Sequence, residues 1–329
     1  MRPAGPGGLL SGAHGTGTAS SPAAGAGPEH FARRRSVGTR AGAGRPDSMD
    51  PTRIAFERRG HGRPLILLHG LGDRRQSWKV VMTRLVQDYE VICVDLPGFG
   101  SSPAPSPDEP YDVLTMTEDV RALCELHGWE RPHLAGNSLG GSIALELGTQ
   151  GVAGSVTVFS PAGFSDNLAR WGMRAVGVAA NLATRIPTQV KERLANTAPA
   201  RAAARIALRG DPSSPEAKAT RFSVQGLEPG APYVRMVPRI AEYDFAERPI
   251  RCPVTIAWGD QDRTLLPSSA VHAHERVPNA RMVSLIGSGH IPMADDPLTV
   301  AEHIRWTCRA ADLGHRRGAS RGNRGRLRS

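Results

Sequence analysis

Gly136-Asn137-Ser138-Leu139-Gly140-Gly141 carries most of the information about the fold of this chain, because of the segments on either side of it. Residues 132–135 before it predict a short strand, and residues 142–147 after it predict a helix. A serine flanked by glycines at such a junction predicts a tight, strained turn, since bulk two positions away would collide with the neighbouring strand and helix. This turn would lift the Ser138 hydroxyl out of the sheet surface, where a base can reach it.

A serine hydroxyl is a weak nucleophile at neutral pH until a base removes its proton, so an acid and a histidine should follow later strands. The apolar run 254–258 predicts a buried strand, and the loop after it carries two candidate acids, Asp260 and Asp262. The run 281–286 predicts another strand, which ends at Gly287-Ser288-Gly289-His290. A histidine in this loop can swing over the sheet toward the serine, so it is the candidate base.

Two more loops follow predicted strands in the same way. His69-Gly70-Leu71-Gly72-Asp73 comes after residues 64–68, and Asp95-Leu96-Pro97-Gly98-Phe99-Gly100-Ser101-Ser102 comes after residues 91–94. Together with the serine, acid and histidine loops, they make residues 52–163 and 250–312 resemble the α/β-hydrolase superfamily, in its esterase- and lipase-like Ser-His-Asp form with a helical cap. The resemblance implies an α/β-hydrolase fold, with a mostly parallel, doubly wound sheet.

The resemblance also separates the candidate acids. The family pattern Gly-x-x-Asp places the acid at Asp262, whereas Asp260 stands at a variable position. A third candidate, Asp166, lies after the preceding strand, where some members carry their acid. The catalytic residues implied are therefore Ser138 as nucleophile, His290 as base and Asp262 as the acid that orients the histidine.

A tetrahedral intermediate also needs two donors aimed at its oxygen. One predicted donor is the backbone N–H of Leu139, next to the nucleophile at the start of a helix. The match to the family's His-Gly-x motif puts the other at the backbone N–H of Leu71. Haloalkane dehalogenases and most epoxide hydrolases of this fold carry aspartate where this chain has Ser138, so the sequence favours acyl or carbon–carbon chemistry through a serine.

The expected reaction is hydrolysis of a small, fairly apolar carboxylic ester through an acyl-enzyme, with no metal or organic cofactor. The alternatives are a meta-cleavage-type carbon–carbon bond hydrolase, or a thioesterase, lactonase or perhydrolase of the same fold. Outside catalysis, the alternatives are a receptor that binds ligand without turnover and a protein that binds nucleic acid. The expected partner is a small-molecule substrate, and the sequence carries no signal for the oligomeric state.

The net charge of +10 belongs to the two ends of the chain. Residues 1–48 carry a net charge of +4 and residues 313–329 a net charge of +6, so residues 49–312 are neutral. Both ends are rich in Gly, Ala, Ser or Arg and are predicted to be disordered. A neutral core argues against specific nucleic-acid binding. Because Met49 stands where the foldable sequence begins, residues 1–48 are expected to be an upstream extension that folding does not need.

The remaining composition predicts a cytoplasmic protein. The four cysteines, Cys93, Cys124, Cys252 and Cys308, lack metal-ligand spacing and are interpreted as reduced core residues. No apolar run has the length of a signal peptide, and no segment approaches the ~20 apolar residues of a membrane span.

Residues 164–249 lack strand signals and are predicted to form a helical cap, or lid, between the two parts of the core (49–163 and 250–312). Helices are expected over 167–186, 200–208 and 215–224. Residues 164–245 have a net charge of +5, which is consistent either with an acidic substrate or with a solvated helix surface. Four aromatic residues are candidates for the pocket or for the interior of the cap: Trp171, Phe222, Tyr233 and Tyr243.

Overall fold

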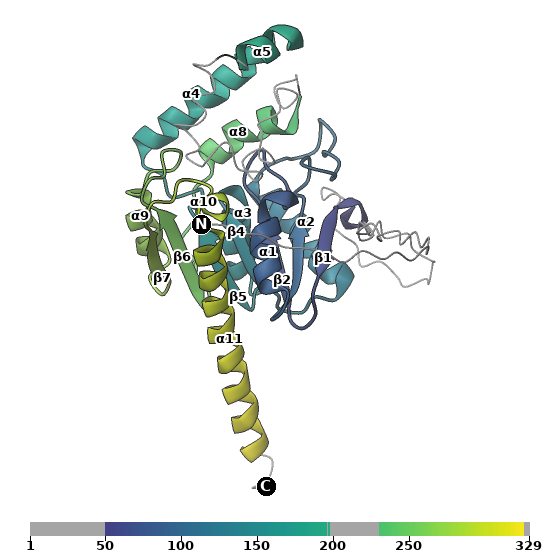
Figure 1. The fold of residues 1–329 in the computed structure, drawn as a ribbon, viewed down its shortest axis with the longest axis vertical. Coiled ribbons are helices and arrows are strands. Elements are labelled where there is room, and N and C mark those ends of the chain that lie inside the picture. Colours follow the sequence, from purple (N-terminus) through teal and green to yellow (C-terminus); the bar gives the residue numbers. More distant parts are fainter. Residues whose placement is uncertain (1–49, 196, 198–229, 326–329) are drawn as a thin grey trace, which may run out of the picture. The chain divides into compact units, whose positions relative to one another are not determined.

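The computed structural model describes residues 50–195, 197 and 230–325 of the 329-residue chain. These residues build a seven-stranded sheet in the order β1-β3-β2-β4-β5-β6-β7. β1 runs antiparallel to β3, and the other neighbouring pairs are parallel (Figure 1). The strands are β1 (Phe56–Arg59), β2 (Pro64–Leu68), β3 (Glu90–Val94), β4 (His133–Asn137), β5 (Ser155–Phe159), β6 (Val254–Gly259) and β7 (Arg281–Leu285).

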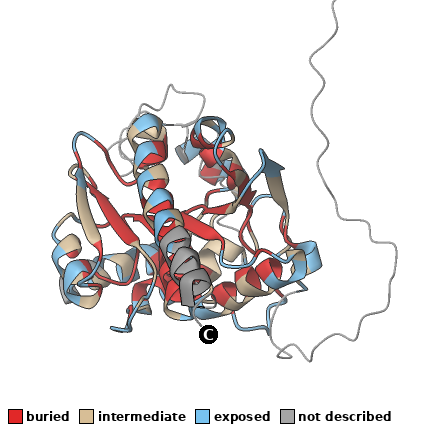
Figure 2. Ribbon diagram, turned by 90° about the horizontal axis from the view of Figure 1, so that it is seen from below, coloured by how far each residue is buried: buried red, intermediate tan, exposed pale blue. Residues whose placement is uncertain are grey.

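Helices cover both faces of this sheet. Alternate residues of β2 show why: Ile66 and Leu68 pack with α2, α3 and α9, whereas Leu65 and Leu67 pack with α1 and α11. Figure 2 shows the buried residues concentrated in the sheet and on the inward faces of these helices. The helices are α1 (Lys79–Leu85), α2 (Val113–His127), α3 (Leu139–Thr149), α4 (Asn167–Ala183), α5 (Thr188–Ala195), α8 (Pro232–Glu242), α9 (Ser269–Arg276), α10 (Pro292–Asp295) and α11 (Pro297–Gly325), with short 3₁₀ turns at Pro51–Arg53 and Arg75–Trp78.

The fold class predicted from the sequence is confirmed: a mostly parallel sheet with helices on both faces, in which the predicted runs 64–68, 254–258 and 281–286 are strands. The antiparallel edge strand β1 carries no comparable signal, because three of its four residues are charged and none is fully buried. A strand with one paired edge needs no continuous apolar run.

The chain between β5 and β6, which we call the inserted segment (residues 164–249), contains three described helices. α4 packs on α8, and Figure 1 shows α8 between α4 and the sheet. α4 ends at Ala183, three residues before the predicted end of that helix. α5 and α8 were not predicted, and the helices expected over 200–208 and 215–224 lie outside the described residues.

The last helix differs from the expectation. α11 continues to Gly325, so the prediction of a disordered tail over 313–329 is wrong for residues 313–325. Its first turns are fixed by the buried residues Val300, Ile304 and Cys308, and propagation of a helix costs far less than its nucleation. Residues 1–48 and 326–329 lie outside the described part of the chain. Within the described part, we find no helix that combines the length and the apolar character of a membrane span.

Candidate active site

Ser138 lies at the turn between β4 and α3 and has a strained backbone. Its φ of 52° is in the left-handed region, which side chains other than glycine rarely adopt. The flanking glycines permit the turn: a Cβ on Gly136 would lie 2.2 Å from Gly140 O, and a Cβ on Gly140 would lie 2.3 Å from Leu68 O. The sharp strand-to-helix turn predicted from the sequence is therefore present, and no larger residue fits at either glycine.

His290 and Asp262 meet in the loops after β7 and β6. The His290 Nδ1 atom lies 2.8 Å from Asp262 Oδ2, and both side chains are buried. The other carboxylate oxygen of Asp262 accepts hydrogen bonds from the backbone N–H groups of Thr264 (2.8 Å) and Leu265 (2.9 Å). An ionised carboxylate can only accept, so His290 Nδ1 is the donor and its Nε2 atom is left as the basic nitrogen in the neutral ring.

The other two candidate acids do not contact His290. Asp260 Oδ1 accepts a hydrogen bond from the backbone N–H of Gly287 at 2.8 Å, and this bond links the loop after β6 to the loop after β7. Asp166 is exposed, immediately before α4. Of the three candidates, Asp262 alone is brought to the histidine.

Sequence reasoning missed the role of Asn137, which precedes the serine. Its buried side-chain amide donates to the carbonyl of Phe159 (3.1 Å) and to the carbonyl of His290 (2.9 Å). It thus joins the end of β4 to the end of β5 and to the histidine loop. The sequence shows only an amide side chain next to the serine, and this does not reveal which carbonyl groups it contacts.

The loop after β2 lies against the serine. The backbone N–H of Leu96 donates to His69 Nε2 (2.9 Å), so the proton of this ring is on Nδ1 and is donated to Gly70 O (2.8 Å). The carbonyl and the next N–H of a trans peptide point in opposite directions, so this bond turns the Leu71 N–H away from the histidine ring. A Cβ on Gly70 would lie 3.4 Å from Ser138 Cβ, which places this peptide beside the serine.

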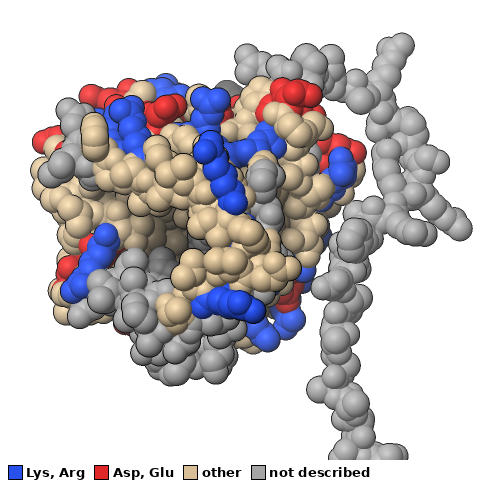
Figure 3. Space-filling view, turned by 90° about the horizontal axis from the view of Figure 1, so that it is seen from above, with Lys and Arg blue, Asp and Glu red and all other residues tan. Residues whose placement is uncertain are grey.

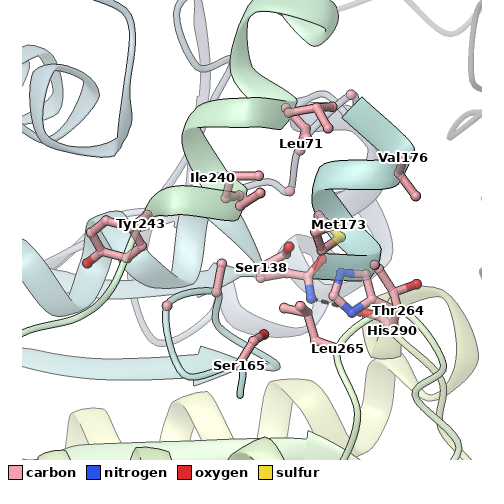
Figure 4. A pocket seen from close by; sticks show the side chains of 18 of the residues that line it. Leu71, Ser138, Ser165, Met173, Val176, Ile240, Tyr243, Thr264, Leu265 and His290 are labelled. Carbon is pink, nitrogen blue, oxygen red and sulfur yellow. Dashed lines mark hydrogen bonds between the residues drawn. The ribbon is translucent and has the colours of Figure 1, made fainter. Parts of the chain in front are cut away.

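Ser138 and His290 line one pocket of about 550 Å³, together with Leu71 and side chains of the inserted segment (Figure 4). Most of its lining is apolar. α4 contributes Met173 and Val176, and α8 contributes Tyr233, Val237 and Ile240. The pocket is therefore built partly by the loops of the sheet and partly by the inserted segment.

The four aromatic candidates have different positions. Tyr233 and Tyr243 line the pocket, and burial raises the pKa of both phenols. The hydroxyl of Tyr243 donates to the buried carboxylate of Glu146 at 2.7 Å, so this tyrosine ties the inserted segment to α3. Trp171 lies outside both the pocket and the protein interior, with 72% of its surface exposed, and Phe222 is outside the described residues.

Asp73 is a second buried carboxyl at the pocket. Its Oδ1 atom accepts from the backbone N–H of Arg74 (2.8 Å), while Oδ2 is buried without a hydrogen bond. Burial raises the pKa of Asp73, and the hydrogen bond from the backbone N–H of Arg74 opposes that shift. Among the described residues, no group of three His, Cys, Asp or Glu side chains could hold a metal ion.

Comparison with known proteins gives the family. A family model described as alpha/beta hydrolase fold matches residues 63–297. The chain belongs to the alpha/beta hydrolase family. This confirms the resemblance inferred from the sequence, and the chain is accordingly a hydrolase.

Three relatives of this alpha/beta hydrolase show how far the likeness extends. An uncharacterized protein of Mycobacterium tuberculosis is 30% identical over 263 residues, which cover 74% of this chain and 75% of the relative. A pimeloyl-[acyl-carrier protein] methyl ester esterase of Aeromonas hydrophila is 40% identical over 94 residues, 29% of this chain and 35% of the esterase. A thermophilic esterase from Thermogutta terrifontis shares the fold with a TM-score of 0.57 and 22% identity, over 78% of this chain and 93% of that one.

Proposed function

We propose that this alpha/beta hydrolase cleaves a small, fairly apolar carboxylic ester through an acyl-enzyme formed on Ser138. The observation that carries the proposal is the Asp262–His290 hydrogen bond of 2.8 Å, in loops that line the same pocket as the strained serine. Two backbone N–H groups occupy one oxygen of Asp262 and leave the other for the histidine. In the neutral ring this arrangement favours the tautomer that carries its proton on Nδ1 and leaves Nε2 as the basic nitrogen.

In the proposed reaction, His290 Nε2 removes the proton of Ser138 as its oxygen attacks the ester carbonyl carbon. The negative charge that develops on the carbonyl oxygen is stabilised by the backbone N–H groups of Leu71 and Leu139. His290 then gives the proton to the leaving alcohol. In the second half, a water molecule attacks the acyl-enzyme, with His290 again accepting and returning the proton.

The electrostatics of the turn support the second oxyanion donor. Leu139 is the first residue of α3, and its N–H is one of the helix N-terminal groups that lack an intrahelical acceptor. The helix dipole adds a partial positive charge at the same end. The donor from Leu71 is supported by the hydrogen bond from His69 to Gly70 O, which orients that peptide.

The pocket supports a substrate of modest size and low polarity. We propose that the inserted segment acts as the cap, since Met173, Val176 and Ile240 supply an apolar wall opposite the catalytic side chains. Such a wall excludes water and contacts the acyl or alcohol part of a substrate. The partial relative from Aeromonas hydrophila, which its name describes as a methyl ester esterase, also supports ester chemistry.

The test is hydrolysis of p-nitrophenyl esters from acetate to decanoate by the full chain. We expect turnover that Ser138→Ala reduces by at least about 10³-fold, with a chain-length optimum that reflects the pocket. Arg58→Gln, at an exposed side chain on β1, serves as a matched control and should retain activity. A folded protein that hydrolyses no ester would overturn the proposal and favour carbon–carbon bond hydrolysis, which vinylogous diketone substrates would reveal. A preference for thioesters or lactones over esters would revise the substrate but not the nucleophile.

A further inference from the structure

α4 and α5 both expose large apolar side chains that lie outside the pocket lining. On α4, Trp171 is 72% exposed, Val178 61% and Leu182 54%, and on α5 Val190 and Leu194 are also exposed. Soluble proteins rarely expose large apolar patches to water without a partner. We call these five residues the outer apolar face.

α4 is apolar on two opposite sides. At about 100° per residue, Trp171, Val178 and Leu182 fall within about 40° of one another around the helix. Met173 and Ala180, which face the pocket and the interior, lie about half a turn away. A helix whose only role was to close the pocket would need apolar side chains on its inner side alone. Its outer side would be polar, because a surface helix normally presents polar residues to water. The outer side therefore calls for a separate explanation.

Positive charge accompanies this face. α4 and α5 contain four basic residues and one acidic residue, and Arg185 lies between them. Arg174, Arg185 and Arg193 are exposed. Figure 3 shows the molecule from above, with Lys and Arg side chains interspersed among uncharged residues. The combination of an exposed tryptophan, aliphatic side chains and flanking arginines is the pattern of helices that lie in the interface of an anionic lipid surface.

The same charges argue against a second copy of this chain as the partner. A twofold dimer through the outer apolar face would place the same patch on both sides of the contact, so the arginines of one copy would face those of the other. An anionic lipid surface attracts these arginines and accepts the apolar side chains between them. We propose that the outer apolar face docks on an anionic lipid surface.

Docking through this face has a consequence for the substrate, which rests on the function proposed above. The opposite side of α4 supplies Met173 and Val176 to the pocket of Ser138. A chain held by α4 at a lipid surface therefore has its apolar pocket one helix diameter from the bilayer. Esters dissolved in the bilayer are the substrate class that this arrangement favours.

Tryptophan fluorescence of the full chain tests the docking directly. Of the five tryptophans, Trp78, Trp129 and Trp258 are buried, so Trp171 and Trp306 are the exposed ones. The probe is a vesicle of phosphatidylcholine, with or without phosphatidylglycerol, that contains lipids brominated on the acyl chains. We expect quenching on the anionic vesicles that Trp171→Phe removes and the matched Trp306→Phe retains.

This readout separates insertion from simple charge attraction. The basic ends of the chain can bring it to an anionic vesicle, but only a tryptophan that enters the bilayer is quenched by brominated acyl chains. Absence of quenching on anionic vesicles would overturn the proposal, and so would quenching that persists in Trp171→Phe. Measuring the same quenching in Ser138→Ala keeps docking separate from catalysis, because insertion in a protein without hydrolytic activity would support the docking alone.

A second comparison measures the effect on turnover. The triple variant Trp171→Ser/Val178→Ser/Leu182→Ser removes apolar surface from the outer face without touching the pocket lining. Its matched control is Leu298→Ser/Trp306→Ser/Leu313→Ser, which changes three comparably exposed residues of α11. We expect the first variant to lose at least about tenfold activity on a vesicle-borne ester while its hydrolysis of a soluble short ester stays within about twofold.

The control variant should keep both activities. Equal loss on vesicle-borne and soluble esters in the outer-face variant would overturn the proposal, since it would indicate damage to the pocket rather than to docking. A concentration-dependent dimer in sedimentation velocity that the same variant dissolves would also overturn it, in favour of a second copy. Failure of the ester assay in the unaltered protein would instead count against the proposed function, and the quenching measurement would still decide the docking.

Discussion

The loops at the carboxyl ends of the strands and the inserted segment contribute to the same pocket but are held in different ways. In the loops, each group is fixed by bonds to the backbone: Asp262 by two N–H groups, His69 by the N–H of Leu96, and Asn137 through two carbonyls. The inserted segment contributes to the pocket mainly through apolar side chains of α4 and α8. Directional bonds require particular residues, whereas apolar contact requires only a suitable size.

The inserted segment is also held by a directional attachment outside the pocket lining. Arg235 of α8 donates to the carbonyls of Pro105, Ser106 and Glu109, and its guanidinium lies 4.8 Å from the ring centre of Tyr111. Under the proposed function, the chemical step would depend on directional bonds in the loops and substrate choice on apolar contacts of the inserted segment. Substitutions in the loops should change the rate of the chemical step, and substitutions in the inserted segment should change which substrate is accepted.

The largest expected effect is at the acid. Asp262→Asn should lower kcat by about 10⁴-fold, because an amide at this position supports the wrong tautomer of His290. Asp260→Asn should stay within about threefold, since its amide oxygen can still accept the N–H of Gly287. Steady-state hydrolysis of one ester gives kcat for both variants. Equal losses of kcat would contradict the assignment of Asp262, rather than Asp260, as the acid that orients His290.

This contrast also marks what the sequence could predict. Ser138, Asp262, His290 and the Leu71 loop stand at strand ends that short apolar runs reveal, and their spacing follows a family pattern. Asn137 and Asp73 were within the quoted motifs, but the bond from Asn137 to the His290 carbonyl and the burial of Asp73 follow only from the folded chain. α5 and α8 were missed because no motif distinguishes helices whose contacts are apolar and interchangeable.

The length of α11 was missed for a different reason. The sequence after residue 312 is rich in Arg, Gly and Ser, a composition that predicts disorder when it is considered alone. Here it follows a helix whose first turns are buried, and Asp296 Oδ1 accepts the N–H of Thr299 at its start. Composition describes a segment in isolation, whereas the helix depends on what precedes it.

The second prediction tests how closely the loops are packed. Gly140→Ala should lower the free energy of unfolding by at least about 1–3 kcal/mol, because the new Cβ would lie 2.3 Å from Leu68 O and 2.6 Å from His69 O. These are backbone atoms and cannot rotate away. Urea unfolding followed by circular dichroism measures the loss, and an unchanged midpoint would show that the turn can open.

The third prediction concerns pH and the buried carboxyl of the His69 loop. Burial raises the pKa of Asp73 in the folded protein, so between its ordinary value and the raised value the folded state binds more protons than the unfolded state. The contribution of this group to stability is therefore present at acidic pH and falls as pH rises through that window. Asp73→Asn does not titrate, and it should gain stability relative to the unaltered protein as pH rises. Urea unfolding of both proteins over the acidic range checks the sign, and an Asp73→Asn variant that loses stability relative to the unaltered protein as pH rises would contradict it.

The smallest expected effect is in the inserted segment, at a second glycine that lies in a helix. Gly172 of α4 has open space around the position of a Cβ, unlike Gly140. Gly172→Ala should therefore stabilise α4 by about 0.5–1 kcal/mol, because alanine loses less backbone entropy on forming a helix.

If the inserted segment unfolds together with the sheet, the gain appears in the global free energy of unfolding. If α4 opens by itself, the gain appears only as slower hydrogen exchange of the α4 amides. Destabilisation by both measures would contradict the open environment of this glycine. The two favourable outcomes differ in whether the pocket wall can move independently of the loops that carry Ser138 and His290.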